Sequence, residues 1–154
     1  MKESALWKKL NQLAKKNKWH LTRIESSTGV RGIPDVYCMV EGHSFWLELK
    51  SKLGKNCGLS NYQINWHLKH IRSGGKVFIL VPSTLQSGFE ILKINDPMTK
   101  TLRDSETLRD SETLRDSETL PDSKSLPDSK SLPDIHISQI SSNTNLEKLI
   151  LSIL

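Results

Sequence analysis

The spacing of hydrophobic residues changes from a helical to a strand-like period within the first 32 residues. Leucines recur at intervals of three and four within residues 3–18, with lysines on the other faces, which predicts an amphipathic helix. Residues 19–25 alternate apolar and polar side chains and predict a strand. Residues 26–32 are mostly polar and contain glycine, so they predict a loop.

The next apolar segments predict a hairpin, a helix and two further strands. Residues 34–40 and 44–50 are strand-like and are joined by a short turn-forming sequence. Ser60 and Gln63 have the spacing of a capping box, which predicts a helix that runs to about residue 72. Two more strands are expected, the second at the edge of the sheet, over residues 76–81 and 89–94. The order predicts an α/β fold with a mixed central sheet flanked by helices.

A six-residue repeat begins at residue 101. TLRDSE occurs three times and is followed by TLPDSK, SLPDSK and SLPDIH. With one leucine per repeat, neither a helix nor a strand gains a continuous apolar face, so a low-complexity, disordered tail is predicted. A hexapeptide β-solenoid is the alternative. We expect a domain over residues 1–95, a linker over 96–136 and a short amphipathic helix over 137–154, and removal of residues 101–154 is expected to leave the chemistry intact.

Charge and aromatic residues divide the chain at the same place. Residues 1–100 carry 16 Lys and Arg against 7 Asp and Glu and contain every aromatic residue. The rest of the chain carries 6 basic and 10 acidic residues. A basic body favours a polyanionic partner, most often nucleic acid.

Several classes of protein are not expected from this sequence. No apolar run approaches the roughly 20 residues that span a bilayer. The N-terminal residues lack the apolar region of a signal peptide, and two cysteines form no disulfide framework, so we expect an intracellular protein, in the cytoplasm of a bacterium or of a phage-infected host. No GxxxxGK motif occurs, which excludes an ATP-driven translocase and predicts no nucleotide cofactor.

Asp35, Glu48 and Lys50 are the candidate catalytic residues. Because side chains alternate along a strand, Glu48 and Lys50 lie on one face and apolar residues fill the other. A turn formed by residues 42–43 places Asp35 opposite Lys50, whereas a turn formed by residues 41–42 places it opposite Glu48. Either register brings the three side chains to one face. A solvated strand face is the alternative interpretation.

The chemistry of this set suits a hard cation. Two carboxylates offer the oxygen ligands that Mg²⁺ prefers, and Mg²⁺ retains water molecules in its other positions. The backbone carbonyl of Leu49 is a further candidate ligand. A metal-bound water is an activated nucleophile, and Lys50 can orient it or stabilise charge that develops on a phosphate.

These residues resemble the PD-(D/E)XK nuclease superfamily, most closely its VRR-type (virus-type replication-repair) nucleases, and are similar to archaeal Holliday-junction resolvases. The matching motifs, in chain order, are Glu3 on the first helix, Ser26-Ser27-Thr28-Gly29, Gly32-Ile33-Pro34-Asp35, Glu48-Leu49-Lys50-Ser51, Leu59-Ser60-Asn61-Tyr62-Gln63 and Gly75-Lys76-Val77. The resemblance covers roughly residues 1–95 and implies a small restriction-endonuclease-like domain.

The resemblance also implies a Mg²⁺-dependent phosphodiesterase, with Mn²⁺ as a substitute for Mg²⁺. Asp35 and Glu48 are then metal ligands, and Lys50 is the catalytic residue on the side of the general base. Glu3 matches the helix-borne carboxylate of the family, a further catalytic and metal-binding residue. Gln63 matches the family's helix-borne catalytic Gln, although the capping box is another reason for its presence.

Four basic residues flank the expected site, and each is either a phosphate contact or an ordinary surface charge. They are Arg23, Arg31, Lys52 and Lys55. The lysines of the first helix are either its solvated side or a patch for the backbone of duplex DNA.

A zinc site formed by histidine and cysteine residues is a weaker hypothesis. His67 and His70 lie three residues apart on the second helix, and Cys57 precedes them, but this spacing matches no common zinc site. Packing or exposed histidines are the alternative. Cys38 is expected to be a buried thiol that points away from the catalytic face.

The expected function is that of a Mg²⁺-dependent, structure-specific DNA endonuclease. It hydrolyses phosphodiester bonds in branched DNA, either a Holliday junction or a flap, in DNA repair, recombination or phage replication. Resolution of a junction takes two symmetric cuts and predicts a homodimer, whereas a monomer suits nicking or flap removal. The alternatives are a nucleic-acid-binding module that keeps the fold without cleaving, and a restriction-type nuclease.

Overall fold

The computed structural model describes residues 1–24, 31–51, 55–83, 88–96 and 135–154. The helices in these ranges are α1 (Glu3–Asn17), the 3₁₀-helix η2 (Lys55–Gly58), α2 (Asn61–Arg72) and α4 (Leu146–Leu151). The strands are β1 (His20–Arg23), β2 (Val36–Val40), β3 (His43–Leu49), β4 (Val77–Pro82), β5 (Phe89–Asn95) and β6 (His136–Asn143). The two helices and five strands expected before the repeat are confirmed, with their ends displaced by one or two residues.

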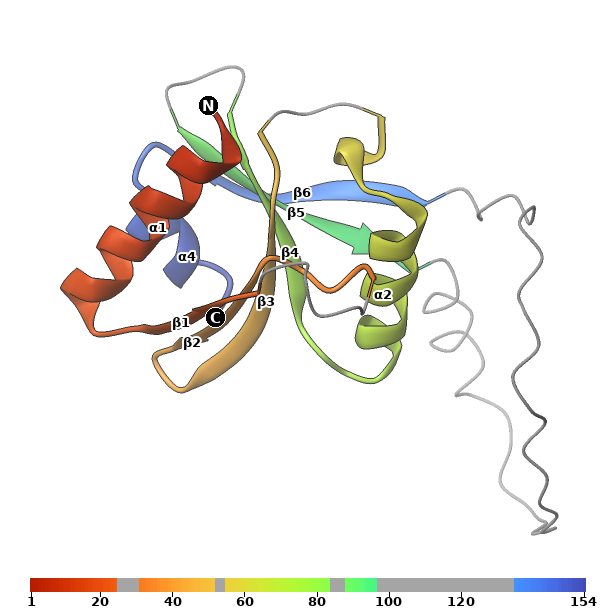
Figure 1. Ribbon diagram of the computed structural model, residues 1–154, viewed down its shortest axis with the longest axis horizontal. Helices are drawn as coiled ribbons and strands as arrows, with labels where there is room; N and C mark the ends of the chain where they lie inside the picture. Colours follow the sequence, from red (N-terminus) through yellow and green to blue (C-terminus); the bar gives the residue numbers. More distant parts are fainter. Residues whose placement is uncertain (25–30, 52–54, 84–87, 97–134) are drawn as a thin grey trace, which may run out of the picture.

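The six strands form one mixed sheet that does not close into a barrel (Figure 1). Its order is β1-β2-β3-β4-β5-β6. Strands β3 and β4 are parallel, and every other neighbouring pair is antiparallel. The parallel pair follows from its connection, because η2 and α2 carry the chain back to the start of β4. The expected α/β class and mixed sheet are confirmed.

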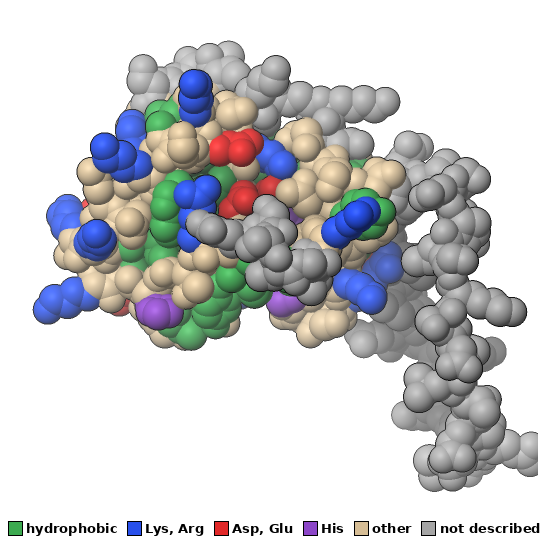
Figure 2. All heavy atoms as spheres, in the orientation of Figure 1, with side chains coloured by type: hydrophobic (Ala, Val, Ile, Leu, Met, Phe, Trp, Pro, Cys, Tyr) green, Lys and Arg blue, Asp and Glu red, His purple; other side chains and the backbone are tan. Residues whose placement is uncertain are grey.

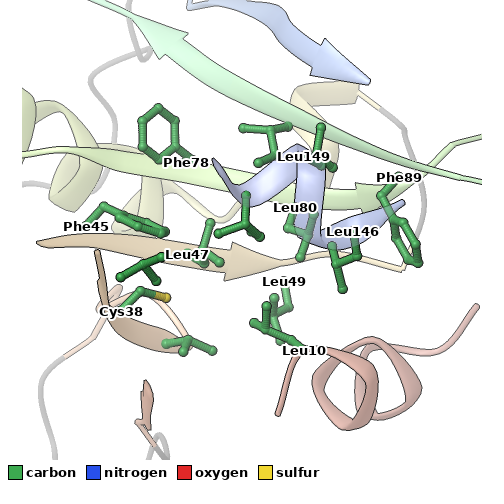
Figure 3. Close-up of a cluster of buried hydrophobic side chains, with 14 of the residues drawn as sticks. Leu10, Cys38, Phe45, Leu47, Leu49, Phe78, Leu80, Phe89, Leu146 and Leu149 are labelled. Atoms are coloured by element: carbon green, nitrogen blue, oxygen red, sulfur yellow. The ribbon is translucent and has the colours of Figure 1, made fainter. Parts of the chain in front are cut away.

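Helices cover both faces of this sheet. Helices α1 and α4 lie on one side, and α2 lies on the other, where it packs against β4 and β5 (Figure 1). Beneath α1 and α4, alternate residues of β2 and β3 form the larger core; Cys38, Phe45 and Leu47 meet Leu10 and Leu149 there (Figure 3). No helix in the described ranges is both long and apolar enough to cross a membrane.

The turn between β2 and β3 sets the register of the candidate catalytic residues. Glu41 and Gly42 form this turn, and both have positive φ angles, 48° and 81°, as a two-residue type I′ hairpin turn requires. Of the two registers considered, the structure therefore has the one with its turn at residues 41–42. The β2–β3 ladder ends at Val36, so Asp35 lies level with Glu48.

The C-terminal segment differs most from the sequence-based expectation. Strand β6 pairs along β5, so β5 is not an edge strand, and the helix expected over residues 137–154 is confined to α4. Leu149 and Ile150 of α4 are buried in the larger core, so the folded unit is not limited to residues 1–95. The expected disorder of the repeat, and its β-solenoid alternative, concern residues 97–134, which lie outside the described ranges.

Candidate active site

Asp35 lies where β1, β2 and β3 meet. Its backbone carbonyl accepts a hydrogen bond from the N–H of Ile24 (2.8 Å), and its Oδ2 accepts one from the N–H of Leu49 (2.8 Å). The next residue, Lys50, donates its backbone N–H in the other direction, to the carbonyl of Leu80 on β4 (3.1 Å). Because the N–H and C=O of one strand residue point to the same side, the Leu49 carbonyl is directed to the side where Asp35 lies.

Glu48, Lys50 and Gln63 form a hydrogen-bonded group on the same face of the sheet. The Lys50 ammonium lies 3.0 Å from Glu48 Oε1 and donates to Gln63 Oε1 (3.3 Å). The Gln63 amide donates to Glu48 Oε1, which completes the group. Lys50 and Gln63 are thereby held against the Glu48 carboxylate.

Gln63 is also part of the cap of α2. Its Oε1 accepts the backbone N–H of Ser60 (3.0 Å), and its own N–H donates to Ser60 Oγ (3.3 Å). The two interpretations of Gln63 are therefore compatible, because one oxygen accepts both the cap N–H and the Lys50 ammonium. The cap fixes the side chain that reaches the carboxylate.

Burial controls the protonation of the two carboxylates. Glu48 is 1% exposed, and its burial raises its pKa to about 7, an effect that the charge of Asp35 increases and Lys50 opposes. Burial likewise raises the pKa of Asp35, against the hydrogen bond from Leu49 and the charge of Lys50. A cation bound nearby would therefore favour the ionised form of both carboxylates.

One oxygen of this site has no partner in the described part of the chain. Glu48 Oε2 is buried and accepts no hydrogen bond from any described residue. A buried carboxylate oxygen normally has a donor or a cation beside it. Asp35 and Glu48, with the Leu49 carbonyl, therefore fit a hard divalent cation.

Glu3 is not grouped with these two carboxylates. Within the described ranges, no three His, Cys, Asp or Glu side chains lie close enough together to hold a metal ion. Glu3, the first residue of α1, acts at a distance, since its charge raises the pKa of both Asp35 and Glu48. The structure thus brings together Asp35, Glu48, Lys50 and Gln63 and leaves Glu3 nearby.

Basic side chains surround the acidic groups. On the face drawn in Figure 2, carboxylates gather near the middle, and Lys and Arg side chains lie around them. Arg23 lies over the Trp7 ring (5.5 Å to its centroid), and its charge lowers the pKa of Asp35. Arg31 donates to the Tyr62 hydroxyl (3.1 Å) at the start of α2. Lys52 lies outside the described ranges, and Lys55 is the first residue of η2.

The histidines and cysteines do not assemble a zinc site among the described residues. His67 lies on the buried side of α2 and is fully buried, and burial lowers its pKa to about 4. His70 stacks on the Trp66 ring, with the two ring centroids 4.8 Å apart. Cys38 is buried in the larger core, on the opposite face from Glu48, as expected, and burial raises its pKa.

Gly32 lets the chain before Asp35 pass close to α2. A Cβ atom at this position would lie 2.3 Å from the backbone oxygen of Tyr62, and the φ angle of Gly32 is +88°. Backbone atoms of a helix cannot move aside cheaply, so only glycine fits. The glycine of the sequence motif Gly32-Ile33-Pro34-Asp35 thus has a packing reason that does not depend on catalysis.

We expect Gly32→Ala to lower the free energy of unfolding by about 2–5 kcal/mol, from overpacking of about 1–3 kcal/mol and the left-handed backbone of about 1–2 kcal/mol. Urea denaturation measures this change. Gly74→Ala is the matched control, because Gly74 also has a positive φ (+82°) but its Cβ would meet no atom within 4 Å. Equal losses in the two variants would show that the approach to α2 has no energetic role.

Comparison with models of protein families, with curated proteins and with solved structures found no match. Asp35, Glu48, Lys50 and Gln63 form the candidate active site of the described residues. The buried Glu48 carboxylate, with one oxygen that accepts no hydrogen bond from a described residue, the half-buried Asp35 carboxylate and the Lys50 ammonium can bind a divalent cation and a phosphate together.

Proposed function

We propose that the protein is a Mg²⁺-dependent endonuclease that hydrolyses phosphodiester bonds in branched DNA. The observation that carries this proposal is the buried Glu48 Oε2, which accepts no hydrogen bond from a described residue, beside Asp35 and Lys50. The charge distribution also supports a nuclease. The carboxylate pair lies in an otherwise basic body, and the surrounding positive charge attracts a polyanion to this acidic centre.

Each residue has a role in this proposal. Asp35, Glu48 and the Leu49 carbonyl would hold the ion, with Mn²⁺ as a substitute for Mg²⁺. When bound, the ion would supply the Lewis acidity that makes a water molecule more acidic and polarises the phosphate. Lys50 orients the attacking water and stabilises negative charge on the phosphate, and Gln63 fixes the position of the Lys50 ammonium. Glu3 adds negative charge near the ion.

The restriction-endonuclease-like fold, the VRR-type family and a role in DNA repair, recombination or phage replication are parts of the same proposal. Arg23 and Arg31 contact phosphates beside the site, and Lys52 and Lys55 extend this contact. Symmetric cutting of a Holliday junction takes a homodimer, whereas a flap takes one copy.

Cleavage of labelled four-way junction, flap and linear duplex, with Mg²⁺ or with EDTA, tests the proposal. We expect cleavage of a branched substrate in Mg²⁺ and none in EDTA. Cleavage that persists in EDTA would contradict the metal-dependent mechanism. Tight binding of branched DNA without cleavage in Mg²⁺ or Mn²⁺ would instead support a module that binds nucleic acid and does not cleave it.

The raised pKa of Glu48 predicts how stability changes with pH. Between about pH 4.5 and 7 the unfolded chain ionises Glu48 while the folded protein still binds the proton, so without metal the free energy of unfolding falls as pH rises through this window. The contribution is at most about 3 kcal/mol. Thermal denaturation at about pH 4 and about pH 8, on either side of the window, measures it.

Glu48→Gln is the control for this pH dependence. The amide does not titrate, so the difference in stability between the wild type and this variant isolates Glu48 from other groups. Mg²⁺ should raise the melting temperature of the wild type more at pH 8 than at pH 5, because it binds the ionised carboxylate, and it should have little effect on the variant. A pH-independent difference would show that Glu48 titrates normally.

A further inference from the structure

Four rings form a continuous row beside the candidate active site. Tyr37 and Trp46 are cross-strand partners, with centroids 5.2 Å apart, and Trp46 contacts Trp66 of α2 edge to face at 5.3 Å. Trp66 stacks on His70, one helical turn further along. We call Tyr37, Trp46, Trp66 and His70 the aromatic row.

The aromatic row reaches the surface because α2 covers only part of its face of the sheet. Helix α2 packs on β4 and β5, and the rings of the row are each only partly buried. Met39, which alternates onto the same face of β2 as Tyr37, is 38% exposed. Figure 2 shows hydrophobic side chains at the surface below the carboxylates, next to histidines. The row is thus an open platform and not part of a closed core.

A hollow of about 410 Å³ lies along this platform. Tyr37, Trp46 and His70 line it, together with His43 and Lys76. No acidic residue is among its described lining residues. Its volume is in the range of small-ligand sites, about 300–1,000 Å³. Flat rings beside cationic and neutral donors suit a planar, anionic ligand such as a nucleotide.

The three elements that build the candidate active site also build this platform. On β3, Trp46 precedes Glu48 by two residues and shares its face, which separates them by about 7 Å along the strand. Tyr37 of β2 follows Asp35, which directly precedes that strand, by two residues, and on α2, Trp66 follows Gln63 by three. A strand whose phosphate lies at the carboxylates can therefore reach the rings with a neighbouring nucleotide.

We propose that the aromatic row stacks an unpaired nucleobase of the DNA strand that is cut. This inference rests on the proposed function, since it assumes a phosphodiester at Asp35 and Glu48. Bases within a duplex are already stacked on their neighbours, so only a strand with an unpaired segment offers a free face to the rings. The platform thus selects branched DNA with a single-stranded segment, such as a flap, over continuous duplex.

The test measures binding in EDTA, so that no strand is cut. Fluorescence anisotropy compares a labelled single strand of about 20 nucleotides with the same strand carrying abasic sites at its central positions. We expect the wild type to bind the abasic strand about 5- to 150-fold more weakly, from stacking of about 1–3 kcal/mol per base at tenfold per 1.4 kcal/mol. Equal affinity for the two strands would overturn the inference, whatever any variant does.

Variants then locate the stacking. Trp46→Ala should lose most of the discrimination between normal and abasic strands, Trp46→Phe should keep most of it, and binding of blunt duplex should change little in either. Met39→Ala is the matched control, because it removes exposed apolar surface from the same face without removing a ring. Unchanged discrimination in a folded Trp46→Ala protein, checked by circular dichroism, would place the base elsewhere and overturn the proposal.

The cleavage assay separates this inference from the proposed function. If the wild type cleaves branched DNA in Mg²⁺ but binds normal and abasic strands equally well, the nuclease proposal is supported and base stacking on the aromatic row is contradicted. A wild type that distinguishes them and never cleaves contradicts the nuclease and supports base stacking.

Discussion

Asp35→Asn and Lys50→Met are each expected to lower Mg²⁺-dependent cleavage of branched DNA by at least about 10²- to 10³-fold, the usual cost of removing one preorganised electrostatic group. Asn keeps an oxygen that can accept the 2.8 Å hydrogen bond from the Leu49 N–H, so the strand ends stay in place while the charge on the ion is lost. Met keeps the length of the Lys50 side chain and removes the ammonium beside Glu48. Gel assays under single-turnover conditions measure the rates.

The two variants should differ in their effect on metal binding. Asp35→Asn removes a ligand and should weaken the stabilisation that Mg²⁺ gives in thermal denaturation. Lys50→Met removes a positive charge that competes with the ion and should leave this stabilisation intact. Glu147→Gln is the control, because Glu147 on α4 forms an exposed ion pair with Lys16, and its cleavage rate should match the wild type. Full activity in Asp35→Asn would remove Asp35 from the site.

The face of the hairpin that carries the candidate site could be predicted from alternation alone. A period of two places Glu48 and Lys50 together whatever their neighbours are, and the structure has them 3.0 Å apart. The register could not be predicted in the same way, because Glu41-Gly42 and Gly42-His43 are both acceptable turns. The left-handed conformation of Glu41 decides between them.

The role of Gln63 shows a second limit of sequence reasoning. The sequence allows two interpretations of this residue, as part of a capping box or as a catalytic side chain, and no sequence pattern distinguishes them. The structure shows the cap and, at the same Gln63 oxygen, a hydrogen bond from Lys50. The aromatic row was also missed, although its signal was present in the positions of Tyr37 and Trp46 two residues from the candidate carboxylates.

Strand β6 could not be predicted because its sequence, HISQISSN, has few apolar residues and follows a repeat with no apolar face. Its pairing comes from β5, whose backbone groups on that side need partners. Helix α4 was predicted as an amphipathic segment, but its position was not, since spacing alone does not say which surface an apolar stripe covers. It packs into the core under β4 and β5, near Leu80 and Phe89 (Figure 3).

The packing of α4 changes the effect expected for removal of the C-terminal segment. A chain that ends at Asn95 loses the partner strand of β5 and uncovers the larger core where Leu146, Leu149 and Ile150 are buried. Burial of three such side chains stabilises a protein by about 1.5–3 kcal/mol each, which is comparable with the whole stability of an ordinary domain, about 5–15 kcal/mol. We therefore expect this truncated protein to lose cooperative thermal unfolding and, with it, cleavage.

A matched variant separates the folded C-terminal elements from the repeat. Asn95 and His136 are cross-strand partners at the ends of β5 and β6, so a turn of about five residues can replace residues 97–134 without moving either strand. This replacement shortens the connection by roughly half three times over. Each halving reduces the entropic cost of closing the loop by about 0.6 kcal/mol. The variant should therefore unfold at a temperature equal to or above that of the full chain. Its cleavage of branched DNA should be unchanged. If both variants unfold like the full chain, β6 and α4 do not belong to the core; if both lose their fold, the repeat itself is required.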